Sequence, residues 1–137
     1  MTQLSKNFTL EELVASTTAA NLKIKNTPND TAVGNLKALA VNTLQPIRDL
    51  WGSAIFVSSG YRCAQLNGLI GGATNSQHLT GHAADISAGN SDNNKKLFDM
   101  IVKSDIPYDQ LIDEYRYQWI HVSFNSGKNR KQILHIA

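Results

Sequence analysis

The sequence predicts an α+β fold, in which helices pack on a mostly antiparallel sheet, as a single domain over residues 1–137. Two observations support this prediction. One long segment, residues 31–51, has apolar side chains at helical spacing. The second half of the chain holds short runs rich in β-branched and aromatic residues, separated by turns and one further helical segment. A chain of 137 residues is long enough to bury a core without disulfides.

A first helix is expected over residues 10–16. Thr9 and Glu12 have the spacing of a capping box, in which the threonine hydroxyl accepts a hydrogen bond from the backbone N–H three residues later. Phe8 and Leu13 lie where a hydrophobic staple would place them. Because both patterns mark the same N-terminus, the helix is expected to begin directly after Thr9.

A long helix is expected over residues 31–51, after a turn at residues 26–30. Pro46 lies inside this segment and should kink or break the helix, since proline has no backbone N–H and its ring clashes with a preceding carbonyl. Gly52 is a suitable C-terminal stop. The buried stripe of this helix is expected to comprise Leu36, Leu39, Ala40, Thr43, Ile47, Leu50 and Trp51.

The remaining elements are five strands and two helices. The strands are expected over residues 54–61, 82–87, 109–115, 118–124 and 132–137. A short helix, RCAQLNGLIGG, follows the first strand and ends at Gly71 and Gly72, before the loop ATNSQHLTG. Another helix, capped by Ser91 or Asp92, follows the second strand. Its apolar face is expected to comprise Leu97, Phe98, Ile101 and Val102.

Composition and charge exclude several classes of protein. The one cysteine, Cys63, rules out an intramolecular disulfide and is interpreted as a buried helix residue. The net charge is only +2, and the densest basic group is Lys128, Arg130 and Lys131, so no basic stripe for nucleic acid is present. No run approaches the roughly 20 apolar residues of a membrane span. Residues 1–16 contain no apolar signal-peptide core, so we expect synthesis in the cytoplasm.

The segment WIHVSF carries the first candidate for chemistry. Alternate side chains of a strand face opposite ways, so Ile120, Val122 and Phe124 are expected to share the core face. His121 then points away from the core, together with Trp119 and Ser123. A lone outward histidine often has no function, so the interpretation of His121 depends on what lies beside it.

The segment SQHLTGHAAD supplies further metal-ligating side chains. His78 is expected in a loop, and Asp85 in a strand whose Ala84 and Ile86 face the other way. Two imidazoles and one carboxylate are typical of a catalytic zinc site that keeps its fourth position open. The alternative is that Asp85 binds backbone or a nearby lysine. Neither the HExxH motif nor the GxSxG elbow is present, and His82 and His135 lie outside this set.

The pattern S-x-H-x-x-G-x-A-x-D, followed downstream by W-x-H, resembles the zinc D-Ala-D-Ala carboxypeptidase family. That family includes the vancomycin-resistance D-Ala-D-Ala dipeptidases and the phage L-alanyl-D-glutamate endolysins. The resemblance to its short single-domain branch covers nearly the whole chain in order, with FTLEELVAS, NLKALAVNTLQPIRDLWG, VSSGYRCAQLN and GGATNSQHLTGHAADI among the matching segments. It implies a D-Ala-D-Ala carboxypeptidase/hedgehog-like fold and one Zn²⁺ ion.

The resemblance implies a role for each matching residue. His78, Asp85 and His121 match the three zinc ligands. Arg62 matches an arginine that polarises the scissile carbonyl or holds substrate, and Ser76 matches a serine that lines the substrate site. Three aromatic residues are further candidates for the cleft: Tyr61, Tyr115 and Trp119.

The general base is less directly indicated. Family relatives often carry a carboxylate three residues before the last histidine ligand, and this chain has Gln118 there, which cannot take a proton. In the short branch of the family, the carboxylate that acts as general base lies in the QLIxE stretch, and Glu114 matches that position. The alternative is Asp113, whose side chain is expected on the opposite face of the strand.

The resemblance implies a zinc metallopeptidase that hydrolyses bonds in peptidoglycan stem peptides, and a monomer is the default expectation. D-Ala-D-Ala carboxypeptidase and L-Ala-D-Glu-type endopeptidase activities both stay open, as does a phage or prophage endolysin that reaches the wall through a holin. The alternative from a different class is a non-catalytic zinc-containing module that binds peptidoglycan within a phage or cell-wall assembly; the glutamine at position 118 keeps this alternative open.

Overall fold

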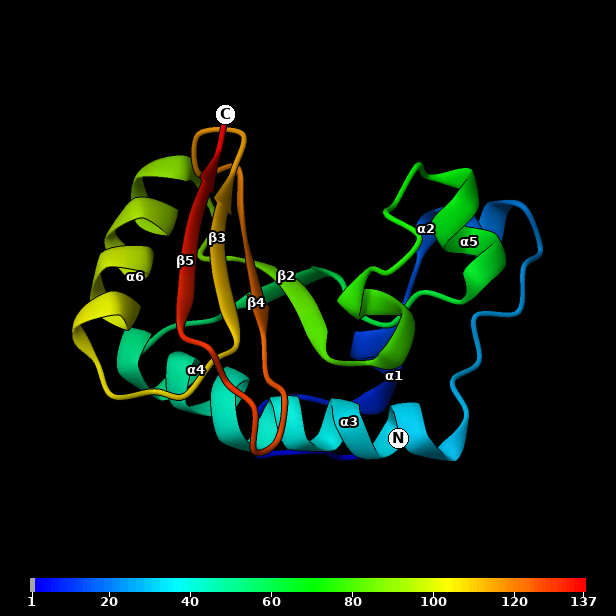
Figure 1. Ribbon diagram of the computed structural model, residues 1–137, viewed down its shortest axis with the longest axis horizontal. Helices are drawn as coiled ribbons and strands as arrows, with labels where there is room; N and C mark the ends of the chain where they lie inside the picture. The colour runs from blue at the N-terminus through cyan, green and yellow to red at the C-terminus, as the bar shows by residue number, and fades with distance from the viewer. Residues whose placement is uncertain (1) are drawn as a thin grey trace.

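A five-stranded sheet with the order β1-β2-β4-β3-β5 organises the computed structural model, which describes residues 2–137 (Figure 1). The strands are β1 (Phe56–Ser59), β2 (Ala83–Ser87), β3 (Gln110–Glu114), β4 (Trp119–Ser123) and β5 (Gln132–Ile136). Neighbouring strands are antiparallel except β3 and β5, which are parallel. The predicted mostly antiparallel sheet is confirmed, and each strand is slightly shorter than its expected range.

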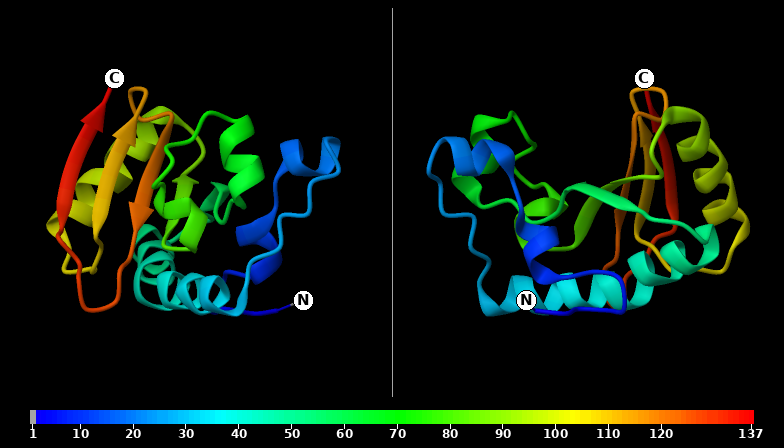
Figure 2. Two further views of the ribbon diagram at one scale, coloured as in Figure 1. Left: turned by 45° about the vertical axis from the view of Figure 1, so that its right-hand side comes forward. Right: turned by 180° about the vertical axis from the view of Figure 1, so that it is seen from behind.

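Helical segments lie on both sides of this sheet and below it (Figures 1 and 2). They are α1 (Leu10–Val14), α2 (Thr17–Asn21), α3 (Asp30–Leu39), the π-helical turn η1 (Ala40–Leu44), α4 (Gln45–Trp51), α5 (Ala64–Leu69), the 3₁₀ turn η2 (Gln77–Thr80) and α6 (Ser91–Lys103). Helix α6 runs along one face of β3, β4 and β5, while α3 and α4 lie below the sheet (Figures 1 and 2). The opposite face of these three strands looks toward α5 and η2.

The start of α1 follows the predicted local chemistry. Thr9 has extended backbone geometry, and its Oγ1 accepts a hydrogen bond of 3.2 Å from the backbone N–H of Glu12. Phe8 and Leu13, the two staple residues, are both buried. The helix ends at Val14, two residues earlier than expected, because Ala15 adopts an extended conformation.

The long helix does not break at Pro46, one of the two predicted outcomes, but its helical repeat is locally distorted directly before the proline. Helix α3 continues through the π-helical turn η1 into α4, and Pro46 lies at the start of α4. The wider turn adds one residue to the helical repeat directly before the proline, where an α-helical turn would meet its ring. It also rotates the residues that follow, so Leu44 is buried while Leu50 is 38% exposed rather than part of the buried stripe.

Three further details differ from the sequence expectation. Cys63 is the half-buried N-cap residue of α5 and not a buried helix residue. Helix α6 is capped by Asn90, whose Oδ1 accepts a hydrogen bond of 2.8 Å from the backbone N–H of Asn93, so neither Ser91 nor Asp92 is the cap. Val102 is exposed, because it lies about 100° around the helix from the buried stripe's last residue.

The central strands place core and site on opposite faces. Ala84 and Ile86 of β2 are buried with Ile120 and Val122 of β4, as predicted. The register of the two strands sets Asp85 directly opposite His121 on the other face.

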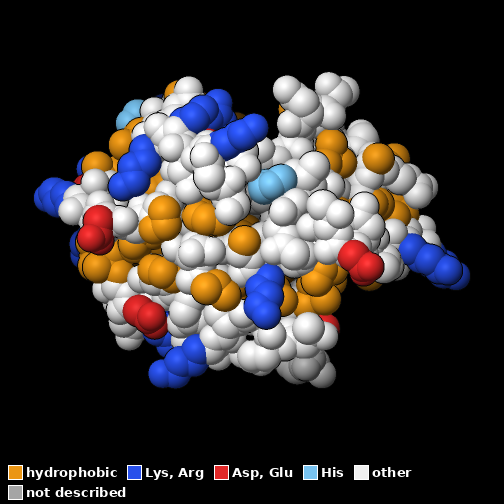
Figure 3. Space-filling model, turned by 60° about the horizontal axis from the view of Figure 1, so that its bottom comes forward, with side chains coloured by type: hydrophobic (Ala, Val, Ile, Leu, Met, Phe, Trp, Pro, Cys, Tyr) orange, Lys and Arg blue, Asp and Glu red, His pale blue; other side chains and the backbone are white. Residues whose placement is uncertain are grey.

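The outer surface mixes side chains of several kinds. On the face drawn in Figure 3, apolar side chains reach the surface at several separate places, with both basic and acidic side chains between them. Across residues 2–137, no helix has the length and apolar character that crossing a bilayer requires.

Candidate metal centre

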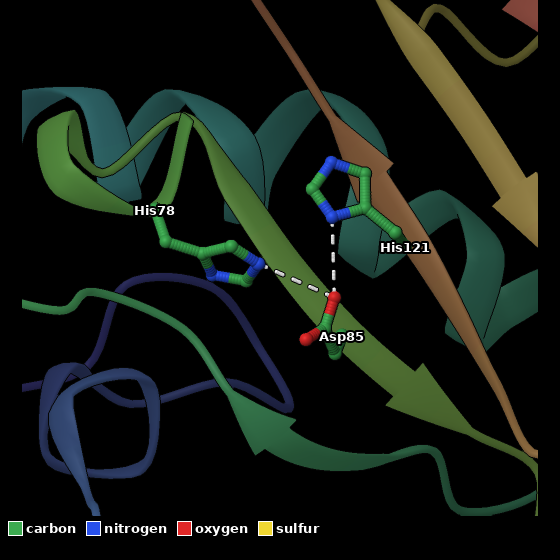
Figure 4. Close-up of side chains that lie close together, drawn as sticks. All are labelled: His78, Asp85 and His121. Atoms are coloured by element: carbon green, nitrogen blue, oxygen red, sulfur yellow. Dashed lines mark hydrogen bonds and ion pairs between the residues drawn. The ribbon is translucent and has the colours of Figure 1, made fainter. Parts of the chain in front are cut away.

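Three side chains from three separate elements meet on the open face of the sheet. His78 comes from η2, Asp85 from β2 and His121 from β4, and both imidazoles point at the same carboxylate oxygen (Figure 4). Nε2 of His78 lies 3.3 Å from Oδ1 of Asp85, and Nδ1 of His121 lies 3.2 Å from that oxygen. His78 is 2% exposed and His121 is 9% exposed, so this cluster is largely removed from bulk water.

The backbone directly after β1 fixes the tautomer of His78. Nδ1 of His78 lies 2.6 Å from the carbonyl oxygen of Gly60, and because a carbonyl only accepts, Nδ1 carries the proton. The lone pair of Nε2 therefore points toward Asp85. Gly60 is required for this arrangement, because a Cβ at that position would lie 2.2 Å from the carbonyl oxygen of Leu13. At the other end of η2, Gly81 adopts a left-handed conformation with φ of +80°.

The charge on Asp85 is stabilised by its two neighbours. Burial alone raises the pKa of this carboxyl, but its interactions with the adjacent rings of His121 and His78 outweigh that effect. The net result is an Asp85 pKa well below its usual range. The carboxylate is therefore ionised at neutral pH, which is the state that ligates a cation.

The donor set fits a single zinc ion. The three donor atoms lie within 4.8 Å of one another. In a tetrahedral zinc site with ligand distances of about 2.0–2.1 Å, neighbouring donors are about 3.3–3.4 Å apart. The separations from Asp85 to both imidazoles match that spacing closely. Three protein ligands also leave a fourth position open, which is the arrangement of catalytic rather than structural zinc sites.

A cleft of about 740 Å³ surrounds the three donors. Its size falls within the range of small-molecule and peptide sites. One wall comes from the segment between α5 and η2, and the other comes from β3, β4 and their connecting turn. The lining residues that carry chemistry or aromatic rings are Arg62, Ser76, Gln77, Glu114, Tyr115, Trp119 and Arg130.

Glu114 lines this cleft, whereas Asp113 does not. Nε1 of Trp119 donates a hydrogen bond of 3.0 Å to Oε2 of Glu114, which orients the carboxylate. Asp113 is buried on the opposite face of β3, where it contacts His135. The structure therefore brings only the first of the two candidate bases to the metal donors, as the alternation of the strand predicts.

Arg62 and Ser76 lie together on the other wall. Nη2 of Arg62 donates to Oγ of Ser76 at 3.4 Å, and the same oxygen accepts a 3.2 Å hydrogen bond from the backbone N–H of His78. Nε of Arg62 is buried and has no hydrogen-bond partner among residues 2–137. Burial lowers the pKa of Arg62, while the charges of Asp85 and Glu114 raise it. Because Arg62 also lines the cleft, its guanidinium is suited to bind an oxygen of a substrate.

Some candidates from the sequence lie elsewhere. Tyr61 lines a separate hollow next to Thr80 and His82, so it is not a cleft residue, whereas Tyr115 and Trp119 are. His82 contacts the hydroxyl of Thr80 and does not line the cleft that holds the three donors. Its ring takes no part in the cluster of metal donors.

The sequence reasoning missed two cleft residues, Gln77 and Arg130, and the buried Asp109 behind them. Oε1 of Gln77 lies 3.4 Å from Nε2 of His121, and Gln77 is joined through Asp109 to Arg130. Gln77 could have been considered because it lies between Ser76 and His78. No pattern in the sequence links Asp109 or Arg130 to the site, since their contacts arise only from the folding of the β4–β5 connection.

An α+β domain with a His–Asp–His donor set, a carboxylate and an arginine around one cleft defines a metal-dependent hydrolase. Comparison with known proteins agrees with this class. The chain matches the family described as Peptidase M15 over residues 6–123 and belongs to it. The matched range includes all three metal donors, Glu114 and Arg62.

One curated relative adds a narrower likeness. The chain is 47% identical over 47 residues to the zinc D-Ala-D-Ala carboxypeptidase of Streptomyces albus G. These residues are 34% of this chain and 18% of that protein, so the matched stretch is a small part of the relative's length.

Proposed function

We propose that this protein is a zinc-dependent peptidase that hydrolyses peptide bonds in the stem peptides of bacterial peptidoglycan. The observation that carries the proposal is the convergence of His78, Asp85 and His121 in one cleft with Glu114 and Arg62. The relative named zinc D-Ala-D-Ala carboxypeptidase supports both the metal and the type of substrate.

The protein's own side chains would divide the reaction between them. A zinc ion held by His78, Asp85 and His121 supplies Lewis acidity, which is how such sites make water nucleophilic near neutral pH. Glu114, oriented by the indole of Trp119, accepts the proton of the attacking water and later passes it to the leaving amine. Ordinary carboxylate chemistry is sufficient for both transfers, because the same group acts first as base and then as acid.

Arg62 acts on the opposite side of the scissile bond. Its buried Nε has no partner within residues 2–137, and its charge is held near Asp85 and Glu114. A donor fixed in a desolvated position stabilises an oxyanion better than water does, because it needs no reorganisation as charge develops. Ser76 positions this arginine through its hydroxyl.

Two bonds are the leading candidates, D-Ala-D-Ala at the end of the stem and L-Ala-D-Glu within it. The 740 Å³ cleft has room for either pair of residues. A carboxypeptidase needs a group that binds the terminal carboxylate, and Arg62 or Arg130 could serve. An endopeptidase needs a cleft open at both ends.

The test is digestion of purified peptidoglycan by the zinc-loaded protein, with a chelated sample as control, followed by mass spectrometry of the released fragments. Chelator-sensitive cleavage is expected, and the fragment masses identify the bond. If folded protein with one bound zinc per chain releases no fragment, the peptidase proposal is wrong. The alternative of a non-catalytic peptidoglycan-binding module is then supported if the same protein co-sediments with the wall material.

A further inference from the structure

A buried carboxylate lies behind the metal donors and is not explained by the reaction itself. Asp109, directly before β3, is 1% exposed. Its Oδ1 accepts hydrogen bonds from Nε of Arg130 at 2.9 Å and from the backbone N–H of Arg130 at 3.0 Å. Its Oδ2 accepts from Nη2 of Arg130 at 2.9 Å. A buried charge of this kind is tolerated because it is fully paired and hydrogen-bonded.

One further donor reaches the same carboxylate from the metal side. Nε2 of Gln77 donates to Oδ2 of Asp109 at 2.8 Å. The other end of this amide, Oε1, lies 3.4 Å from Nε2 of His121. Among residues 2–137, Gln77 is therefore the side chain that joins the Asp109–Arg130 pair to a metal donor, and it directly precedes His78 on η2.

The chemistry of these groups determines which of them donates and which accepts each hydrogen bond. Hydrogen bonds from Arg130 lower the pKa of Asp109 to about 2, so its carboxylate is ionised and only accepts. Gln77 must then turn its NH₂ group toward Asp109, which leaves its carbonyl oxygen facing the imidazole. An amide oxygen only accepts, so Nε2 of His121 carries the proton, and the lone pair of Nδ1 points toward Asp85.

We propose that Arg130, Asp109 and Gln77 form a hydrogen-bonded relay that sets the tautomer and orientation of His121 and thereby holds its Nδ1 ready for the metal. The relay rests on the proposed function, because it assumes that His121 ligates zinc. Its members are positioning residues. They act through His121, and the known effect of such partners is to raise metal affinity and to fix the ligand ring.

The two histidines are held in complementary ways. His78 donates its Nδ1 proton to the Gly60 carbonyl and presents Nε2, whereas His121 uses its Nε2 proton and presents Nδ1. A rigid backbone carbonyl fixes the first ring. The second ring depends on a side-chain amide, whose orientation is undetermined unless something else fixes it. Asp109 and Arg130 supply that missing constraint.

The first experiment compares zinc affinities by competition with a chelating dye. Gln77→Met removes both hydrogen bonds and keeps the length of the side chain. The matched control is Gln132→Met, which alters a glutamine of similar burial whose side-chain contact is with Gln110 and not with the relay. We expect Gln77→Met to weaken zinc binding by about 10- to 100-fold and Gln132→Met to leave it unchanged.

A paired exchange tests the direction of the hydrogen bonds. Gln77→Glu alone sets two carboxylates against each other and should weaken zinc binding. Adding Asp109→Asn supplies an amide that can donate to the new carboxylate at position 77, which still accepts from His121. The asparagine NH₂ would also face Nη2 of Arg130, so we expect the double variant to recover part of the affinity lost by Gln77→Glu, a result that a purely structural role for either residue does not produce. If the double variant binds zinc more weakly than Gln77→Glu, the relay is wrong.

The wild-type protein supplies a measurement that does not depend on any variant folding. In the zinc-loaded protein, the imidazole region of a ¹H–¹⁵N spectrum should show His121 coordinated through Nδ1, with a slowly exchanging proton on Nε2. Coordination through Nε2 overturns the relay. Unchanged zinc affinity in Gln77→Met, with zinc lost in His121→Ala, overturns the relay alone. Retention of zinc by His121→Ala overturns the proposed metal centre and the relay together.

Discussion

At the scale of single residues, the site works because each ionisable group has neighbours that select its state. Asp85 is kept ionised by two imidazoles, and Glu114 is oriented by the Trp119 indole. His78 and His121 are each left with one free ring nitrogen. None of these states follows from residue type alone, since an aspartate or a histidine in water has no fixed partner.

Glu114→Gln is expected to lower kcat for peptidoglycan cleavage by about 10²- to 10⁴-fold, because an amide cannot accept the proton of the attacking water. The amide keeps the size of the side chain and lies outside the three donors, so zinc content should be unchanged. The measurement is turnover together with metal content. Asp113→Asn is the control, since Asp113 lies on the opposite face of β3. Full activity in Glu114→Gln would remove it from the mechanism.

Asp109 predicts a pH dependence of stability. Hydrogen bonds from Arg130 lower its folded-state pKa to about 2 from the ordinary 3.8, so the pair stabilises the fold above about pH 4. That contribution is lost as the pH falls from about 4 toward about 2. In urea unfolding between pH 5 and pH 2.5, the free energy of unfolding should therefore fall more steeply for the wild type than for Asp109→Asn. Parallel curves for the two proteins would contradict this assignment.

Strand alternation was sufficient to place His121 and Asp85 on the face away from the core and Asp113 opposite Glu114, and the family resemblance grouped His78 with them. The same patterns could not identify Gln77 or Asp109. Their importance depends on the path of the β4–β5 connection, which brings Arg130 back toward η2. Short-range periodicity does not predict that a distant connection will fold back against η2.

At the scale of elements, the position of η2 depends on close packing between β1 and α1. The backbone N–H of Tyr61 donates to the carbonyl of Leu13 at 2.8 Å, and Gly60 lies against the same carbonyl. That contact sets the position of the Gly60 carbonyl, which accepts a hydrogen bond from Nδ1 of His78. The first helix of the chain thereby helps to position a metal donor far along the sequence.

Gly60→Ala is expected to destabilise the protein by about 1–3 kcal/mol, the usual cost of overpacking, because the new methyl group would lie 2.2 Å from the Leu13 carbonyl oxygen. The shift of β1 away from α1 should also move the carbonyl that fixes His78 and weaken zinc binding. Thermal unfolding and zinc competition measure the two effects.

Gly68→Ala is the matched control for this prediction. Gly68 lies in α5, and a Cβ there would have nothing within 4 Å. Alanine should be neutral or stabilise the helix by about 0.5–1 kcal/mol. If both variants behave alike, close packing at Gly60 is not what positions η2.

The long helix shows where local prediction of elements ends. Helical spacing gave the correct extent of residues 31–51, since α3, η1 and α4 are continuous. It placed Leu50 on the buried stripe because it assumed a uniform repeat of 3.6 residues. The π-helical turn before Pro46 changes that repeat, and only the packing of the helix against the sheet shows where the extra residue is accommodated.

At the scale of the whole molecule, the three metal donors come from three separate elements of the chain. η2, β2 and β4 each contribute one donor, and β2 and β4 are paired at Asp85 and His121. Without metal, Oδ1 of Asp85 already lies 3.3 Å from Nε2 of His78 and 3.2 Å from Nδ1 of His121, so the three donors are assembled by the fold itself. The metal-free chain is therefore expected to fold, with the site less tightly held.

Zinc should accordingly raise the unfolding temperature of the whole domain. A ligand that binds only the folded state adds RT ln(1 + [L]/Kd), which is about 2.7 kcal/mol when free zinc is about 100 times its Kd. Calorimetry of the wild type with zinc and with excess chelator measures the shift. His121→Ala should unfold at the same temperature under both conditions, because it lacks one donor. If zinc does not change the unfolding temperature of the wild type, the three side chains do not form one binding site. A site built from three separate elements cannot bind zinc tightly without stabilising the fold that brings those elements together.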